Sequence, residues 1–227
     1  FDDIRSKWLM SAHECKINCL LDIAKKVPIP FNQRDHALLI HGGGWGMGTY
    51  RSKISALELT PFHLNIIAYN FSELTPDRSQ ISYYMTDPDW SPWIQNKEGK
   101  YGFPPFAPVR IGVRPEFTVS DEYPQLFDIT RRVKAVVGKP GGSTLLDSLE
   151  AATPLVLLEG VGEHEEKNAD LWQKLGFGIN YSDWERTGFD SLELERLHVN
   201  LLAQQGMFPK YIDEVLARIK SIESRNS

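Results

Sequence analysis

The stretch VKAVVGKPGGSTLLDSLEAATPLVLL, residues 133 to 158, decides the fold. Its β-branched start is typical of a buried strand, and the glycines and proline that follow mark a turn. Helix-forming residues come next, and Pro154 precedes a second apolar run. The stretch therefore predicts a strand, a glycine turn, a helix and another strand. Ser143 and Thr144 place two hydroxyls where the helix begins, which suits either a ligand site or a tight corner.

The first half of the chain shows the same order of elements. HALLIH at 36–41 predicts a strand, and GGGWGMG at 42–48 follows it directly as a glycine loop. TYRSKISALEL at 49–59 predicts a helix, and HLNIIAYNF at 63–71 predicts the next strand. Strands that alternate with helices imply a parallel sheet with helices on both faces. We expect an α/β fold with a doubly wound, Rossmann-like and mainly parallel sheet.

Two segments fit this alternation less well. Residues 7–26 have the apolar spacing of an amphipathic helix, so residues 1–30 are expected to be a helical linker or the remnant of another domain. Residues 31–227 then form the Rossmann-like domain. Within it, residues 72–124 are rich in proline and aromatic side chains, and we expect an irregular excursion that returns to the sheet near 109–113. The remaining helices are expected at 122–133, 162–176, 191–205 and 211–224, with a strand at 177–181.

Composition excludes several classes of protein. The chain has 227 residues, 41% of them hydrophobic and 24% charged, which is ordinary for a globular domain. A net charge of −5 argues against a protein that binds nucleic-acid phosphates, which normally presents a basic face. No apolar run is long enough to span a bilayer, and no signal peptide is visible, so we expect a cytoplasmic protein.

Both glycine loops are expected at one edge of the sheet, because ligands of open parallel sheets bind beyond the carboxyl ends of the strands. A helix start offers free N–H groups and a partial positive charge, which suits phosphate. The alternative for Ser143 is an N-cap without a ligand. His41, at a strand end against the first loop, is the candidate catalytic histidine. The loop at 42–48 is neither a dinucleotide fingerprint, since no acid ends the next strand, nor a P-loop, since no Gly-Lys-Ser/Thr follows.

The second unit carries a more specific pattern, over residues 136 to 179. This segment resembles the donor-nucleotide half of GT-B glycosyltransferases, in the branch of the bacterial lipid II GlcNAc transferase and the plant galactolipid synthases. The loop HGGGWGMG resembles the glycine turn after the first strand of that domain. The matching residues are Gly141, Gly142, Ser143, Thr144, Asp147, Pro154, Asn168, Ala169, Gly176 and Gly178.

The resemblance implies a role for each part of this pattern. The turn from Gly141 to Thr144 would hold the diphosphate, and Asp147 would bind the ribose hydroxyls, although most members have the longer glutamate there. Gln normally precedes the Asn-Ala pair and holds the sugar, whereas this chain has acids and a histidine. The alternative for that acidic stretch is a solvated first helical turn. The nucleotide-binding set is Gly43, Gly44, Gly141, Gly142, Ser143, Thr144 and Asp147, and the sugar-binding set is His164, Glu165 and Asn168.

The resemblance also implies a reaction and its partners. We expect a nucleotide-sugar, UDP-linked, as the donor, with no metal and no cofactor, because the helix start and loop amides neutralise the diphosphate in such enzymes. A second domain or partner subunit, on the amino-terminal side, would bind the acceptor and carry the base. The acceptor is unknown. Two alternatives are a GT-B-fold nucleotide-sugar hydrolase or epimerase, and a non-catalytic nucleotide-binding or interaction module.

Overall fold

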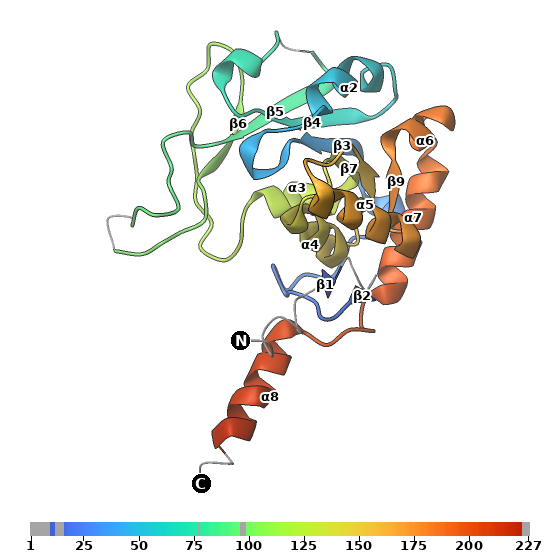
Figure 1. Ribbon diagram of the computed structural model, residues 1–227. Coiled ribbons are helices and arrows are strands. Elements are labelled where there is room, and N and C mark those ends of the chain that lie inside the picture. Colours follow the sequence, from blue (N-terminus) through green and yellow to red (C-terminus); the bar gives the residue numbers. More distant parts are fainter. Residues whose placement is uncertain (1–9, 12–15, 77, 96–98, 224–227) are drawn as a thin grey trace.

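A computed structural model describes residues 10–11, 16–76, 78–95 and 99–223. Seven strands form one sheet in the order β6-β5-β4-β3-β7-β8-β9 (Figure 1). Neighbouring strands are parallel except β5 and β6, which are antiparallel. The strands are β3 (Asp35–His41), β4 (His63–Ile67), β5 (Ile81–Thr86), β6 (Phe106–Val109), β7 (Val133–Gly138), β8 (Leu155–Leu157) and β9 (Gly178–Asn180). A separate antiparallel pair joins β1 (Met10–Ser11) and β2 (Lys16–Ile17).

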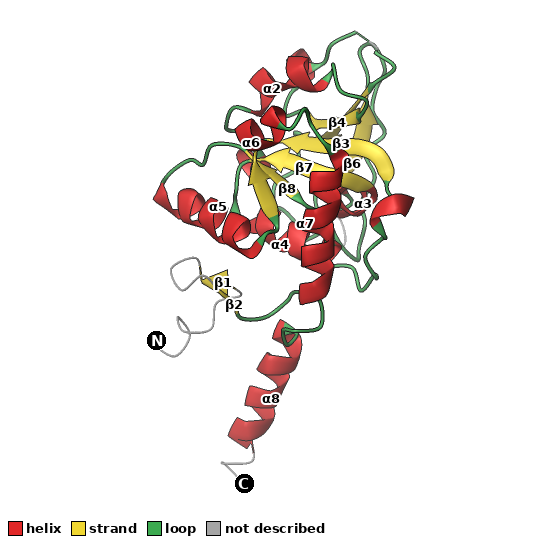
Figure 2. Cartoon of the chain, turned by 90° about the vertical axis from the view of Figure 1, so that its right-hand side faces the viewer, coloured by secondary structure: helices red, strands yellow, loops and turns green. Residues whose placement is uncertain are grey.

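Helices cover both faces of the sheet (Figure 2). They are α2 (Tyr50–Leu57), α3 (Leu126–Arg132), α4 (Gly142–Ala151), α5 (Glu163–Leu175), α6 (Tyr181–Arg186), α7 (Ser191–Gln204) and α8 (Tyr211–Glu223), with 3-10 turns at Phe31–Gln33, Gly43–Trp45 and Phe71–Glu73. Successive side chains of β3 point to opposite faces of the sheet, so they contribute to two separate layers of the core. Leu39 packs with Leu145 of α4 and Trp172 of α5. Leu38 packs on the opposite face with residues of α2 and α6. The last helix, α8, extends away from the rest of the molecule.

The strand order reverses between β3 and β7. From β3 the chain proceeds through β4 to β5 on one side, and from β7 it proceeds through β8 to β9 on the other. The two strands end side by side, since His41 is the register partner of Gly138. This is the topological switch point, where open α/β sheets bind their ligands. The predicted doubly wound, mainly parallel sheet is confirmed.

The helix expected over residues 7–26 is wrong for its described part. Residues 16–17 form β2, and residues 18–26 are irregular. The reason is a tertiary pairing: the Leu20 N–H donates to the Pro209 carbonyl at 3.0 Å, and the Leu20 carbonyl accepts from the Tyr211 N–H at 2.8 Å. Backbone groups that bind a distant segment cannot close a helix. Residues 7–9 and 12–15 of that prediction lie outside the described residues.

The excursion expected over 72–124 contains two strands of the sheet. β5 was not predicted, and β6 lies at Phe106–Val109, three residues before the expected return. The pairing of Thr86 with Phe106 places the intervening loop at the carboxyl end of β5. α6 was also not predicted. In the part of the chain that is described, each helix is too short or too polar to cross a membrane.

Candidate functional site

Two glycine loops meet at the switch point, as predicted. The β3 loop (residues 42–49) follows β3, and the β7 loop (residues 139–141) follows β7 and leads into α4. Gly141 is the N-cap of α4, and no side chain caps this helix start among the described residues. Ser143 lies inside the first turn, so its alternative role as N-cap is wrong. The N–H groups of that first turn have no partner within the helix and are available to a ligand.

Several positions of the β3 loop require glycine, among them Gly43 and Gly46. Gly43 and Gly46 have φ of 71° and 63°, where side chains are strained. A Cβ atom at Gly46 would also lie 2.6 Å from the ring of Tyr69. The Tyr69 hydroxyl donates to the Gly43 carbonyl, and this bond fixes the loop. Gly44, in contrast, is exposed and open, with nothing within 4 Å of a Cβ built there.

His41 supports the β3 loop. Its Nδ1 accepts the N–H of Gly43 at 3.0 Å, and its side chain is buried. Burial, with the positive charge of Lys139 nearby, lowers the pKa of His41 to about 4. The imidazole is therefore neutral at pH 7, and a general base works best with a pKa near the operating pH. These facts favour a positioning role for His41 over the catalytic one considered from the sequence.

A buried ion pair crosses the switch point. Lys139 of the β7 loop donates its Nζ to Oε1 of Glu165 in α5, and the two residues are 9% and 3% exposed. A Cβ atom at Gly43 would lie 3.1 Å from Cε of Lys139. The lysine side chain thus lies against both glycine loops. Lys139 was not among the site residues predicted from the sequence, although a cation inside a glycine turn after a strand is a recognisable signal for an anion site.

Asp147 lies in the second turn of α4, one turn beyond Ser143 on the same helix face. It is partly buried, and within the described chain its carboxylate has no hydrogen-bond or ion-pair partner. Burial raises the pKa of Asp147 to about 7. An acid that is partly buried without a partner destabilises the folded protein when it is ionised, and such groups cluster at functional sites.

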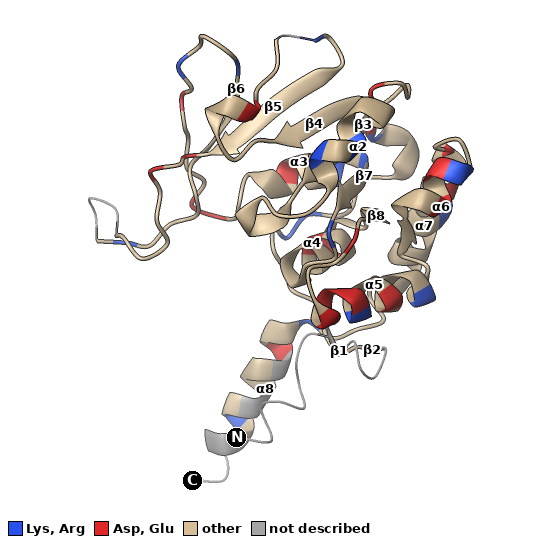
Figure 3. Cartoon of the chain, turned by 45° about the horizontal axis from the view of Figure 1, so that its top comes forward, with Lys and Arg blue, Asp and Glu red and all other residues tan. Residues whose placement is uncertain are grey.

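The three residues predicted to bind the sugar lie in different environments in the structure. His164 is exposed in the first turn of α5. Glu165 faces inward to Lys139, and its Oε2 accepts the N–H of Val161 at 2.7 Å. The amide of Asn168 donates to the Pro140 carbonyl at 2.9 Å. Glu165 and Asn168 therefore brace the β7 loop. The acidic start of α5 is visible as red ribbon in Figure 3.

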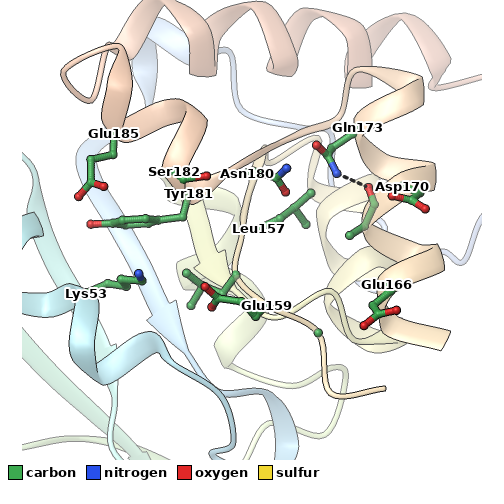
Figure 4. Close-up of a pocket in the computed structure, with 13 residues that line it drawn as sticks. Lys53, Leu157, Glu159, Glu166, Asp170, Gln173, Asn180, Tyr181, Ser182 and Glu185 are labelled. Carbon is green, nitrogen blue, oxygen red and sulfur yellow. Dashed lines mark hydrogen bonds between the residues drawn. The ribbon is translucent and has the colours of Figure 1, made fainter. Parts of the chain in front are cut away.

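A hollow of 380 Å³ lies beside the switch point, between α2, α5, α6 and the ends of β8 and β9 (Figure 4). Lys53, Glu159, Asp170 and Tyr181 are among its lining residues, whereas none of the residues predicted to bind the nucleotide lines it. Glu159 accepts a hydrogen bond from the hydroxyl of Thr49 and so ties this region to the β3 loop. The hollow is thus a neighbour of the predicted site and not the site itself.

No protein-family model and no curated protein sequence matches the chain. Solved glycosyltransferase structures match its fold. The calicheamicin glycosyltransferase CalG4 has a TM-score of 0.51 and 16% identity, over 87% of this chain and 46% of its own. SnogD from Streptomyces nogalater has a TM-score of 0.48 and 12% identity, with coverages of 87% and 46%. For MurG of Acinetobacter baumannii the TM-score is 0.46 and the identity 14%, with coverages of 87% and 52%.

The chain spans about half the length of these structures, since its matches cover 46% to 52% of them. The CalG4 match, together with the seven-stranded sheet, confirms the predicted fold: one Rossmann-like half-domain of the GT-B type. The predicted resemblance to GT-B glycosyltransferases is thereby confirmed at the level of the fold.

Proposed function

We propose that this chain is the donor-nucleotide-binding domain of a glycosyltransferase that takes a sugar from a UDP-sugar. One observation carries the proposal. At the switch point, an uncapped helix start, the buried cation of Lys139 and the unpartnered carboxylate of Asp147 lie along one short segment. A nucleoside diphosphate carries the complementary groups in the same order, with anionic phosphates followed by a ribose that offers two hydroxyl donors.

The diphosphate is proposed to lie against the turn from Gly141 to Thr144. The free N–H groups of the first turn of α4 would donate to its oxygens, and the helix dipole favours an anion there. Gly142 is open, with nothing within 4 Å of a Cβ built there, and Gly44 is open on the facing loop, so backbone can approach the phosphates from both sides. Lys139 would supply the positive charge, which is why we expect no metal in this role.

The ribose is proposed to lie against Asp147. An ionised carboxylate accepts two hydrogen bonds, one from each vicinal hydroxyl, and such charge-assisted bonds are the stronger kind. His164 would then lie nearest the sugar, because it is the exposed member of the predicted sugar-binding set. The acceptor and the catalytic base are proposed to come from a second domain or subunit, since this chain spans about half of the glycosyltransferases that it matches.

Calorimetric titration tests the proposal. The wild-type chain should bind UDP, and Asp147→Ala should weaken that binding by about 1–3 kcal/mol, the scale of a charge-assisted hydrogen bond. Glu150→Gln is the matched control, because Glu150 lies one turn further along α4 and its pKa is also raised to about 7 by burial and by Asp22. Failure of UDP, ADP and GDP alike to bind would refute the proposal, and equal losses in the two variants would remove Asp147 from the site.

A further inference from the structure

Glu165 is held at both oxygens in a place where an acid is unexpected. Its Oε1 accepts from Lys139, and its Oε2 accepts from the N–H of Val161 at 2.7 Å. Only 3% of the residue is exposed. The other acids of this helical turn, Glu163 and Glu166, are exposed, so the usual solvated acid at a helix start does not describe Glu165. Its carboxylate is therefore held in a fixed position at the switch point.

The carboxylate also lies close to the proposed phosphate position. A Cβ atom at Gly141, the N-cap of α4, would lie 3.4 Å from Oε1 of Glu165 and 3.6 Å from Nζ of Lys139. An anionic oxygen and the one buried cation of this loop therefore already meet beside the helix start. Glu165 is the ion-pair partner of Lys139, which is a cation too costly to bury alone.

We propose that Glu165 is an internal anion that competes with the donor's diphosphate for Lys139. The inference rests on the proposed function and deepens it. In the empty site the glutamate neutralises the lysine. When a diphosphate binds, the like charge of Glu165 weakens its hold, so the affinity for the nucleotide is kept moderate. When the nucleoside diphosphate product leaves, Glu165 pairs with Lys139 again, so release of the product does not leave a buried charge without a partner.

The competition predicts in which direction the affinity for UDP changes when the charge of Glu165 is removed. Glu165→Gln removes the negative charge but keeps the size of the side chain, so the diphosphate gains the full attraction of Lys139. UDP should bind about tenfold tighter or more, mainly through slower dissociation. Uridine, which carries no phosphate, should bind as it does to the wild type. A purely structural role of Glu165 would change both ligands alike or neither.

The experiment titrates UDP and uridine into the wild type, Glu165→Gln, Lys139→Met and the double variant. Glu166→Gln is the matched control, because it removes an exposed acid one residue along the same turn. We expect tighter UDP binding in Glu165→Gln only, and we expect the gain to vanish when Lys139 is also methionine. Glu165→Asp, which keeps the charge but shortens its reach to Lys139, should lie between the wild type and Glu165→Gln and serves if the glutamine variant does not fold.

Unchanged or weaker UDP binding in folded Glu165→Gln, or a gain that persists without Lys139, overturns the inference. If Asp147→Ala weakens UDP binding but Glu165→Gln leaves it unchanged, only this inference fails. If the wild type binds none of UDP, ADP and GDP, the proposed function fails with it.

Discussion

Replacing Asp147 with asparagine should stabilise the protein at alkaline pH and weaken nucleotide binding at the same time. Burial raises the pKa of this carboxyl group to about 7, whereas an aspartate in the unfolded chain titrates near 3.8. The folded state therefore holds the proton more tightly than the unfolded state does. The stability that follows is fully present below pH 3.8 and is lost as the pH rises through 7.

The size of the effect comes from that pKa difference. Each unit between the folded and unfolded states corresponds to 1.36 kcal/mol, so a rise from 3.8 to about 7 corresponds to about 4 kcal/mol. Asp147 is partly buried rather than fully enclosed, and we expect roughly 2–4 kcal/mol. For a chain of this size 1 kcal/mol moves the Tm by about 2–4 °C. Asparagine carries no charge, so the gain over the wild type should develop from about pH 3.8 to about pH 7. It should be partial at pH 5 and complete at pH 8.5.

Thermal and urea unfolding of the wild type and Asp147→Asn at those two pH values measure the gain, and calorimetry at pH 8 measures UDP affinity. Glu150→Gln should also gain stability at alkaline pH, by less because Glu150 lies near Lys210, but it should keep UDP binding. A stability difference that is the same at pH 5 and pH 8.5 would show that the Asp147 carboxylate is well solvated. A more stable variant with unchanged UDP affinity would show that the ribose is held elsewhere.

Three further predictions concern the loops, the core and turnover. Gly46→Ala should cost about 1–3 kcal/mol of unfolding free energy in urea, because φ is 63° and the new Cβ would meet the ring of Tyr69, whereas Gly44→Ala at the open position should cost less than about 1 kcal/mol. Arg34→Met should cost about 3 kcal/mol or more by the same assay, since the buried guanidinium donates to four backbone carbonyls, each of which would lose this hydrogen bond. Residues 1–227 alone should bind UDP but should not transfer sugar from a UDP-sugar to an acceptor, as judged by product chromatography, and steady turnover by this chain would place the base within it.

The doubly wound sheet could be predicted because its signals are local. The apolar runs that became β3 and β7, and the glycine loops after them, are visible within a dozen residues each. Their position at one edge then follows from the geometry of parallel sheets. The ribose-binding role of Asp147 was predicted from the resemblance to GT-B glycosyltransferases, and the helix spacing places this residue one turn beyond Ser143.

What could not be predicted depends on contacts between distant residues. The apolar spacing of residues 7–26 does suit a helix, but the pairing of Leu20 with Pro209 and Tyr211 overrides that preference. The pair of Lys139 and Glu165 spans 26 positions, and neither residue alone signals that it is buried. A sequence pattern shows which side chains are available at an edge, whereas only the fold shows which of them already bind one another.

The pairing of residue 20 with residues 209–211 has a consequence for folding order. It is reinforced by an ion pair between Lys210 and Asp22, which spans 188 positions of the chain. The entropy cost of closing a loop grows with the logarithm of the spanned length. This pairing therefore adds little stability until the intervening sheet has brought its two sides together. We therefore expect it to close late, after the sheet has formed. For the same reason we expect this pairing to open independently of the sheet, and its amide hydrogens should exchange with solvent sooner than those of β3 and β7.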